Sequence, residues 1–248
     1  MCIISLRNKR IIITGAGSGI GRETAICISK LGATVIMIDI NEIGLKETLS
    51  SLSGSGHSYY VTDLSNTDSI KDVTKDSVEK NGMLSGLVHC AGVSSRKPLN
   101  VITRGGFNKL MDVNFYSFVE LVRQICKKKS FVNGGSIVVI SSISSIKGYK
   151  AKSEYCVSKA AVDAFIRCMA LELAERRIRI NSVMPATVNT PMAHRAQELN
   201  ASIGTSDDIA PLGITEPYEV ANTIAFLLSD ATKTITGTSI VIDGGTSI

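Results

Sequence analysis

The sequence predicts a three-layer α/β fold, in which a parallel sheet of seven strands carries helices on both faces. Short segments that are apolar at every residue alternate along the chain with longer segments of helical period. Strands that are apolar on both faces are typical of a parallel sheet buried between two layers of helices. The 248 residues suit one such domain, and no change of composition divides them, so we expect a single domain over 1–248.

The first half of the chain contains four predicted strands, each followed by a helix. The strands are 11–13, 34–38, 58–61 and 86–89, and the helices are about 19–31, 43–52, 67–80 and 107–129. The first helix opens on glycines, the second is short and the third is polar. The fourth is long and amphipathic, because Phe107, Leu110, Met111, Phe118 and Val122 lie on or near one of its faces.

The second half continues the same alternation until one segment interrupts it. The strands are 136–140, 178–183 and 239–242, and the helices are 153–176 and about 218–228. The helix 153–176 is predicted from Val162, Phe165, Met169 and Leu173, which recur at spacings of three and four. The segment 186–216 has no clear period, and so long an irregular segment is usually functional. We expect a loop or lid over a substrate, with a disordered surface loop as the alternative.

A glycine-rich turn, Thr14–Gly21, follows the first strand and opens the first helix. Its glycines, Gly15, Gly19 and Gly21, allow a tight turn and a close approach of the backbone to a pyrophosphate. The free N–H groups and the dipole of the helix then favour the negative charge. The turn therefore predicts a nucleotide site, with Ser18 and Ile20 also in contact, and a plain strand-to-helix turn is the alternative.

An acidic residue, Asp39, ends the second strand eighteen residues after Gly21. A carboxylate at this position accepts hydrogen bonds from the ribose hydroxyls of NAD and repels the 2′-phosphate of NADP. The next residue, Ile40, offers no positive charge to that phosphate. We therefore expect NAD to be favoured over NADP, and the alternative role for Asp39 is to cap the following helix.

Two further strand ends are expected to line the nucleotide site. Asp63, followed by Leu64, either reaches an adenine edge or caps the next helix. The segment His89-Cys90-Ala91-Gly92 ends the fourth strand, and its small residues leave room for a cofactor. His89 lies in an apolar strand end, so we predict a structural rather than a catalytic role for it.

Three side chains, Ser142, Tyr155 and Lys159, suit acid/base chemistry on an alcohol or ketone. Ser142 follows the fifth strand, and Tyr155 and Lys159 lie four apart on one helix face. A Tyr pKa of ~10 falls to about 7 if the phenolate is favoured by roughly 4 kcal/mol. A cation about 4 Å away at an effective dielectric of 20 supplies about that amount. We expect Tyr155 to exchange the proton, Ser142 to hold the substrate oxygen and a nicotinamide to exchange the hydride.

The composition argues against several other classes of function. The net charge is +5, and the densest basic run, Lys127–Lys129, is too short to indicate nucleic-acid binding. The apolar runs are shorter than the ~18 residues of a membrane helix. The six cysteines include no Cys-x-x-Cys pair, and no signal peptide is evident. We therefore expect a cytoplasmic protein that binds no nucleic acid, membrane or metal.

These motifs together resemble the short-chain dehydrogenases/reductases over essentially the whole chain. The residues that carry the resemblance are Thr14–Gly21, Asp63, Ala91-Gly92, Asn114, Ser142, Tyr155, Lys159, Asn181–Pro185, Thr190 and Val241–Gly245. The resemblance implies a Rossmann-like fold and an oxidoreductase that uses NAD or NADP on a small-molecule alcohol or ketone. It also implies a homotetramer built through the segments 107–129, 153–176 and the C-terminal segment.

The resemblance further implies roles for individual residues. Asn114 is implied to hold a water beside Lys159 and so to pass protons to solvent. The residues implied to contact the cofactor beyond the glycine turn and the strand ends are Tyr155, Lys159, Pro185, Val188 and Thr190.

Two alternative functions remain open at this stage. A 3-oxoacyl-(acyl-carrier-protein) reductase would receive its acidic carrier on Lys127–Lys129 and Arg176-Arg177 at the pocket edge, although Asp39 counts against it because such reductases generally prefer NADPH. A nucleotide-binding regulatory protein without catalysis is the alternative of another class. The intact set of Asn114, Ser142, Tyr155 and Lys159 argues against it.

Overall fold

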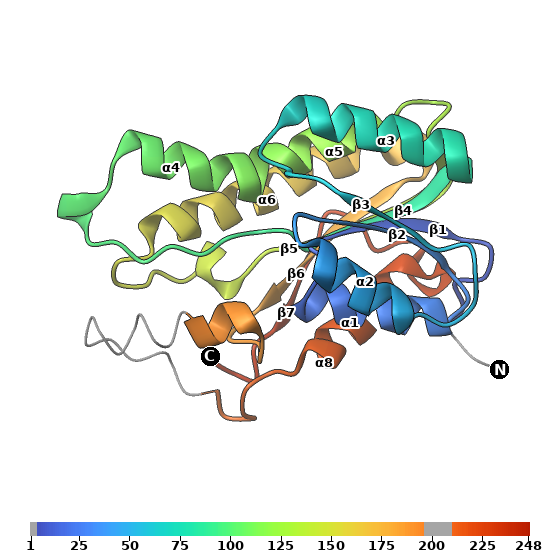
Figure 1. Cartoon of the computed structure of the whole chain (residues 1–248). Coiled ribbons are helices and arrows are strands. Elements are labelled where there is room, and N and C mark those ends of the chain that lie inside the picture. Colours follow the sequence, from blue (N-terminus) through green and yellow to red (C-terminus); the bar gives the residue numbers. More distant parts are fainter. Residues whose placement is uncertain (1–3, 196–209) are drawn as a thin grey trace.

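Seven parallel strands form the middle layer of the structure, a computed structural model that describes residues 4–195 and 210–248 (Figure 1). The strands are β1 (Arg10–Thr14), β2 (Thr34–Asp39), β3 (Ser58–Val61), β4 (Leu84–His89), β5 (Phe131–Ile140), β6 (Arg179–Pro185) and β7 (Ser239–Ile242). Their order across the sheet is β3-β2-β1-β4-β5-β6-β7. The direction of winding therefore reverses between β1 and β4, the place where open α/β sheets bind ligands.

Helices cover both faces of the sheet, as Figure 1 shows. One layer contains α1 (Gly19–Lys30), α2 (Glu42–Ser50) and α8 (Pro217–Leu228), and the other contains α3 (Thr67–Asn81), α4 (Arg104–Met111), α5 (Ser117–Ile125) and α6 (Ser153–Glu172). Helices α1 and α8 lie side by side, as do α3 and α5. The predicted three-layer fold is confirmed.

The two hydrophobic cores explain why the strands are apolar at every position. In β1, Ile11 and Ile13 pack into the core under α1 and α8, whereas Ile12 packs into the core under α3, α5 and α6. In β5, Val138 and Val139 are divided between the same two cores. Successive side chains of a strand point to opposite faces, so a sheet buried on both faces requires an apolar residue at each position.

Helix boundaries follow local capping signals. Asn41 accepts a hydrogen bond from the backbone N–H of Gly44 and so caps α2, and Asn66 caps α3 in the same way. Helix α8 begins with a capping box between Glu216 and Glu219. These side chains satisfy backbone donors that the first helical turn leaves without partners.

The structure corrects several predicted boundaries. The expected helix 107–129 is two α-helices joined by a π-helical segment, Asp112–Tyr116, and it ends at Ile125. The expected helix 153–176 ends at Glu172 and is followed by a 3-10 turn. Strand β5 begins five residues before the predicted position 136, because exposed residues and Gly134, with φ of +78°, hide its start in the apolar pattern.

The segment 186–216 is described only at its two ends. Val188 and Thr215 form a parallel bridge, and the Asn189 N–H donates to the Thr215 carbonyl at 2.9 Å. The two ends are therefore held together beside the carboxyl end of β6. Residues 196–209 lie outside the described part of the chain, so the predicted lid stays a prediction.

Candidate active site

A pocket of about 800 Å³ lies at the carboxyl ends of the strands, across the point where the winding reverses. It gathers residues from segments that follow all seven strands. The predicted site residues that line it are Gly15, Ser18, Gly19, Ile20, Gly21, Asp39, Ile40, Asp63, Leu64, Cys90, Ala91, Gly92, Ser142, Tyr155, Lys159, Pro185, Val188 and Thr190. A sheet edge therefore unites residues that are up to 175 positions apart in sequence (190 minus 15).

The glycine turn depends on the absence of side chains at two positions. Gly15 has φ of +67°, and a Cβ atom on it would lie 2.8 Å from the backbone nitrogen of Ala91. A Cβ atom on Gly21 would lie 2.1 Å from the carbonyl oxygen of Gly15. Glycine is thus required for the left-handed backbone at the first position and for the close packing of helix on turn at the second.

The start of α1 fits an anionic group such as a pyrophosphate. Ser18 is the N-cap residue, but its side chain makes no capping hydrogen bond, and the first turn contains no acidic residue. The unbonded N–H groups and the helix dipole therefore remain available to a negative charge in the pocket. Thr190 lies against the start of this helix, since a Cβ atom placed on Gly19 would be only 3.1 Å from the Thr190 Cγ2.

The Asp39 carboxylate is held in place beside the glycine turn. Its Oδ2 accepts from the Gly17 N–H at 2.9 Å, and its Oδ1 accepts from the Asn41 N–H at 2.9 Å. Because Asn41 caps α2, the capping alternative for Asp39 is wrong. The remaining lone pairs of the carboxylate are free for vicinal hydroxyls, such as those of a ribose.

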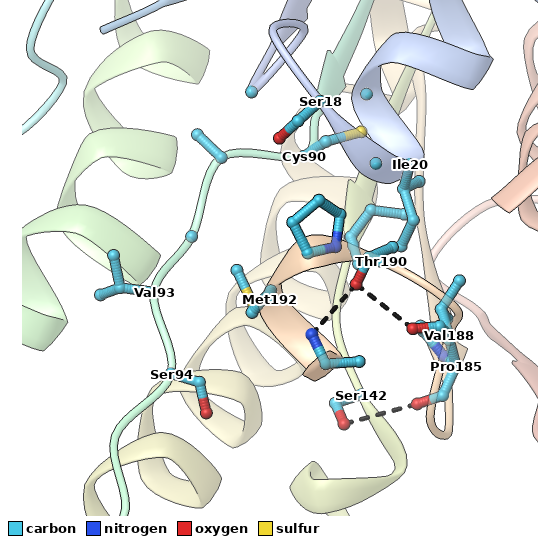
Figure 2. A pocket seen from close by; sticks show the side chains of 18 of the residues that line it. Ser18, Ile20, Cys90, Val93, Ser94, Ser142, Pro185, Val188, Thr190 and Met192 are labelled. Atoms are coloured by element: carbon cyan, nitrogen blue, oxygen red, sulfur yellow. Dashed lines mark hydrogen bonds between the residues drawn. The ribbon is translucent and has the colours of Figure 1, made fainter. Parts of the chain in front are cut away.

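Ser142, Tyr155 and Lys159 meet at the opposite end of the pocket. Ser142 Oγ accepts from the Ser144 N–H at 3.1 Å, and it lies 3.4 Å from the Pro185 carbonyl oxygen (Figure 2). The Lys159 Nζ lies 5.7 Å from the centre of the Tyr155 ring. The three side chains therefore share one wall, as the sequence predicts.

The protonation of Tyr155 differs from the expectation of a lowered pKa. Tyr155 is partly exposed to the pocket. Burial among the surrounding protein atoms nevertheless raises its pKa to about 12, and the hydrogen bond with Ser142 acts in the opposite direction. Burial removes water from the phenolate, and the sequence argument did not include that cost.

Lys159 is itself deeply buried, with 5% of its surface exposed. Its Nζ donates to the carbonyl oxygen of Ile140 at 2.8 Å. Burial lowers the pKa of its ammonium group to about 8, while Asp163 and then Cys90 act in the opposite direction. The cation is thus held by the end of β5, one strand away from the turn that carries Ala91.

Comparison with known proteins agrees with this architecture. A family model described as enoyl-(acyl carrier protein) reductase matches residues 15–247. The chain is 34% identical over 243 residues to a 3-oxoacyl-(acyl-carrier-protein) reductase of Thermotoga maritima, covering 97% of this chain and 98% of that one. The chain belongs to the short-chain dehydrogenase/reductase family.

Other proteins similar to this chain are named for different activities. A D-erythrulose reductase of Gallus gallus is 33% identical over 245 residues, which cover 98% of this chain and 97% of that enzyme. The solved structure of an aldohexose dehydrogenase from Thermoplasma acidophilum superposes with a TM-score of 0.84 at 31% identity, covering 98% of this chain and 96% of that one. The family thus supports an oxidoreductase and leaves the substrate open.

Asn114 is the predicted site residue that does not line the pocket. It lies in the π-helical segment with 1% of its surface exposed. Its Oδ1 accepts from the Val93 N–H at 2.7 Å, and its Nδ2 donates to the Val93 carbonyl and to Ser158 Oγ. Both ends of the side-chain amide are therefore occupied in fixing the segment after β4 against α6. A water relay through Asn114 would therefore have to use the backbone atoms of this residue rather than its side chain.

The remaining strand ends differ in role. Asp63 Oδ1 accepts from the Ser65 N–H, and Asn66, not Asp63, caps α3, so Asp63 is free to face the pocket.

His89 lies in the core, where its Nδ1 is 2.9 Å from Thr14 Oγ1. Burial, followed by the charge of Lys159, lowers the pKa of His89 to about 3. A neutral His89 therefore joins β4 to β1, consistent with a structural role.

Several pocket residues carry no motif in the sequence. Figure 2 shows Val93 and Ser94 on the segment after β4, with Met192 across the pocket from them. Tyr149 and Lys152 add an aromatic ring and a cation from the segment before α6. These residues lie on irregular segments, where the sequence contains no periodic signal that identifies single residues.

The basic residues assigned to an acidic carrier lie at the wrong edge of the sheet. Lys127–Lys129 and Arg176 precede the amino ends of β5 and β6, whereas the pocket lies at the carboxyl ends. Ten residues of β5 place roughly 30 Å between the two edges. Arg176 also donates to the Phe131 carbonyl at 2.5 Å and so holds the start of β5. These side chains do not border the pocket.

Within 4–195 and 210–248, no three His, Cys, Asp or Glu side chains are grouped in a way that suits a metal ion. Over the same ranges, no helix has the length and apolar character needed to cross a bilayer.

Proposed function

We propose that this protein is an NAD-dependent oxidoreductase that interconverts a secondary alcohol and a ketone. The single observation that carries the proposal is the layout of one pocket. Ser142, Tyr155 and Lys159 form one end, and the glycine turn with Asp39 forms the other. A pocket that has an acid/base end and a nucleotide end suits a dinucleotide cofactor between them.

Each catalytic side chain has a defined task in this proposal. Tyr155 removes the alcohol proton in oxidation and returns it in reduction. Ser142 donates a hydrogen bond to the substrate oxygen and so orients it. The ammonium of Lys159 stabilises the Tyr155 phenolate and thereby opposes the effect of burial. The nicotinamide, when bound, supplies the hydride exchange.

The cofactor residues are proposed from the same pocket. The start of α1, with Ser18, Gly19 and Ile20, would hold the pyrophosphate. The adenosine end would contact Asp39, Ile40, Asp63, Leu64, Cys90, Ala91 and Gly92, and the nicotinamide end would contact Tyr155, Lys159, Pro185, Val188 and Thr190.

Replacing Asp39 by Ala is expected to weaken NAD binding by about 10- to 100-fold, since a charge-assisted hydrogen bond contributes roughly 1.5–3 kcal/mol. NADP binding should weaken less or improve, because the fixed carboxylate no longer repels a 2′-phosphate. Titration of both cofactors measures the change. Asp72→Ala, an exposed change on α3 outside the pocket, is the matched control. Unchanged affinities for both cofactors in D39A would refute the assignment.

The direct test of the proposed function is a panel of alcohols and ketones followed by NADH absorbance, with NADPH in parallel. Turnover of a secondary alcohol or ketone with NAD(H) is the expected result. Binding of NAD(H) without turnover over the whole panel would favour the regulatory alternative. Failure to bind either dinucleotide would overturn the proposal.

The carrier-linked reductase remains a second candidate, and the 34% identity to the Thermotoga maritima enzyme favours it. Asp39 argues for NAD rather than NADPH, and the basic residues once assigned to a carrier lie at the far edge of the sheet. Comparing a carrier-bound 3-oxoacyl substrate with its free thioester distinguishes the two. Only the carrier-linked reductase should prefer the carrier-bound form strongly.

The assembly and compartment are also proposals. We infer a homotetramer, because Tyr116, Val157 and Leu171 expose apolar side chains on the helices through which the family commonly associates. Sedimentation is expected to give four times the mass of one chain, and a monomer would contradict it. Free thiols at the five described cysteines suit a reducing cytoplasm. One domain over 1–248 suits a pocket that draws its lining from both halves of the chain.

A further inference from the structure

A buried carboxylate, Asp163, lies on α6 one helical turn after Lys159. Only 4% of its surface is exposed, and it does not line the pocket. Burial of a carboxylate is unfavourable unless hydrogen bonds or an opposite charge compensate for lost water. A charge in this position therefore requires an explanation beyond the packing of α6.

Three serine hydroxyls surround this carboxylate. Ser141 Oγ donates to Asp163 Oδ2 at 2.8 Å, and Ser182 Oγ donates to Oδ1 at 2.7 Å. Ser239 Oγ lies 3.3 Å from Oδ1 and 2.7 Å from Ser182 Oγ. The serines come from the end of β5, from β6 and from β7, three neighbouring strands of the sheet. Asp163 thus connects one helix to three strands.

These connections lead directly to the reacting side chains. Ser141 precedes Ser142 in the chain, and its N–H donates to the Val183 carbonyl at 2.8 Å. Ser141 Oγ also lies 3.4 Å from the backbone carbonyl oxygen of Lys159. The Asp163 cluster therefore fixes the backbone that carries Ser142 against the helix that carries Lys159.

The cluster also bears on the charge of Lys159. Besides Tyr155 on its own helix, the titratable groups facing the ammonium are His89 at the end of β4 and Cys90, which follows that strand. Burial raises the pKa of Cys90 to about 12 and lowers that of His89 to about 3, so both are neutral near pH 7. Asp163 is the carboxylate that opposes the effect of burial on the pKa of Lys159. The two groups form no direct ion pair and act through the protein interior.

We propose that Asp163 is the buried counter-charge of Lys159 and, through Ser141, Ser182 and Ser239, a positioning residue for the reacting side chains. The electrostatic part requires only the two buried charges. The catalytic part rests on the proposed function, in which a protonated Lys159 supports Tyr155.

The catalytic part is tested by the pH profile of Asp163→Asn, which removes the charge and keeps the shape. Without the anion, Lys159 loses its proton at lower pH, so the alkaline limb of kcat/KM should move down by about one pH unit. Ser239→Ala is the matched control, because it removes a hydroxyl of the cluster and leaves the charge. The alkaline limb of kcat/KM should keep its wild-type position in Ser239→Ala, and also in Asp163→Glu, which retains the negative charge. Superimposable profiles for D163N and wild type would overturn the proposal.

The electrostatic part is tested without turnover, by denaturant unfolding at pH 7 of the wild type, D163N, K159M and the double variant. Removing the anion alone leaves an uncompensated buried ammonium, which is strongly destabilising. We expect D163N to lower the folding equilibrium constant about fivefold more in the wild-type background than in the K159M background, which is the loss that a pKa shift of about one unit implies at pH 7. Equal losses in both backgrounds would overturn the proposal.

The same set of variants covers a failure to fold. If D163N does not fold, recovery of a folded K159M/D163N double variant supports the counter-charge, and a double variant that also fails to fold refutes it. Because unfolding needs no substrate, its outcome stands even if the panel of alcohols and ketones shows no activity. A failed proposed function and a failed inference are therefore distinguishable.

Discussion

Replacing Tyr155 by Phe is expected to lower kcat for the best substrate of the panel by about 10²- to 10⁴-fold, the usual contribution of general acid–base catalysis. The change removes one oxygen and leaves the ring, so the pocket wall and the 5.7 Å approach of Lys159 are retained. NADH binding should therefore change little. Steady-state rates, with cofactor affinity measured separately by titration, check the two expectations.

The control for this change is Tyr218→Phe, which removes the same oxygen from an exposed residue on α8 outside the pocket. Its kcat should equal that of the wild type. Survival of NAD(H)-linked turnover at the wild-type rate in Y155F would show that another group transfers the proton. A loss of NADH affinity equal to the loss of kcat would place Tyr155 in binding rather than in catalysis.

Gly21→Ala is expected to have the largest effect on the nucleotide end of the pocket. Its Cβ would lie 2.1 Å from the carbonyl oxygen of Gly15 and 3.1 Å from the nitrogen of Ala16, both backbone atoms that cannot rotate away. Forcing α1 from the turn should cost about 1–3 kcal/mol in the free energy of unfolding. Because the start of α1 forms the proposed pyrophosphate site, NAD affinity should fall at least tenfold.

The matched control is Gly105→Ala on α4, another helical glycine. A Cβ there would meet no atom within 4 Å. Alanine limits the unfolded chain more than glycine does, so this change should stabilise the protein by about 0.4–1 kcal/mol. Chemical denaturation and NAD titration of both variants give the comparison. A G21A protein as stable as G105A would show that the turn tolerates a side chain.

The sheet was predictable because the physical signal is local. Each strand must present apolar groups to two cores, and this requirement appears directly as runs such as Ile11–Ile13. Strand starts were less predictable. The beginning of β5 contains exposed residues and a glycine of positive φ, and only its pairing with β4 shows that the strand has begun.

The candidate site was predictable in its members but less so in its energetics. A sequence identifies a cation four residues from a tyrosine, but it does not report how many protein atoms surround the hydroxyl. In the structure, burial dominates, and the pKa of Tyr155 rises to about 12 instead of falling. The hydrogen bonds of Asn114 were equally hidden from the sequence. Its side-chain amide bonds to Val93 and Ser158, and nothing in the neighbouring residues indicates these partners.

By itself, the sequence determined the fold class, the glycine turn, Asp39 and the trio of Ser142, Tyr155 and Lys159. Chain order is sufficient for these, because the carboxyl ends of parallel strands meet at one edge of the sheet. Only the tertiary structure decided which charges are buried and which groups compensate them. Asp163 meets three serines that lie on separate strands, and such contacts depend on how the helix packs on the sheet rather than on any local pattern.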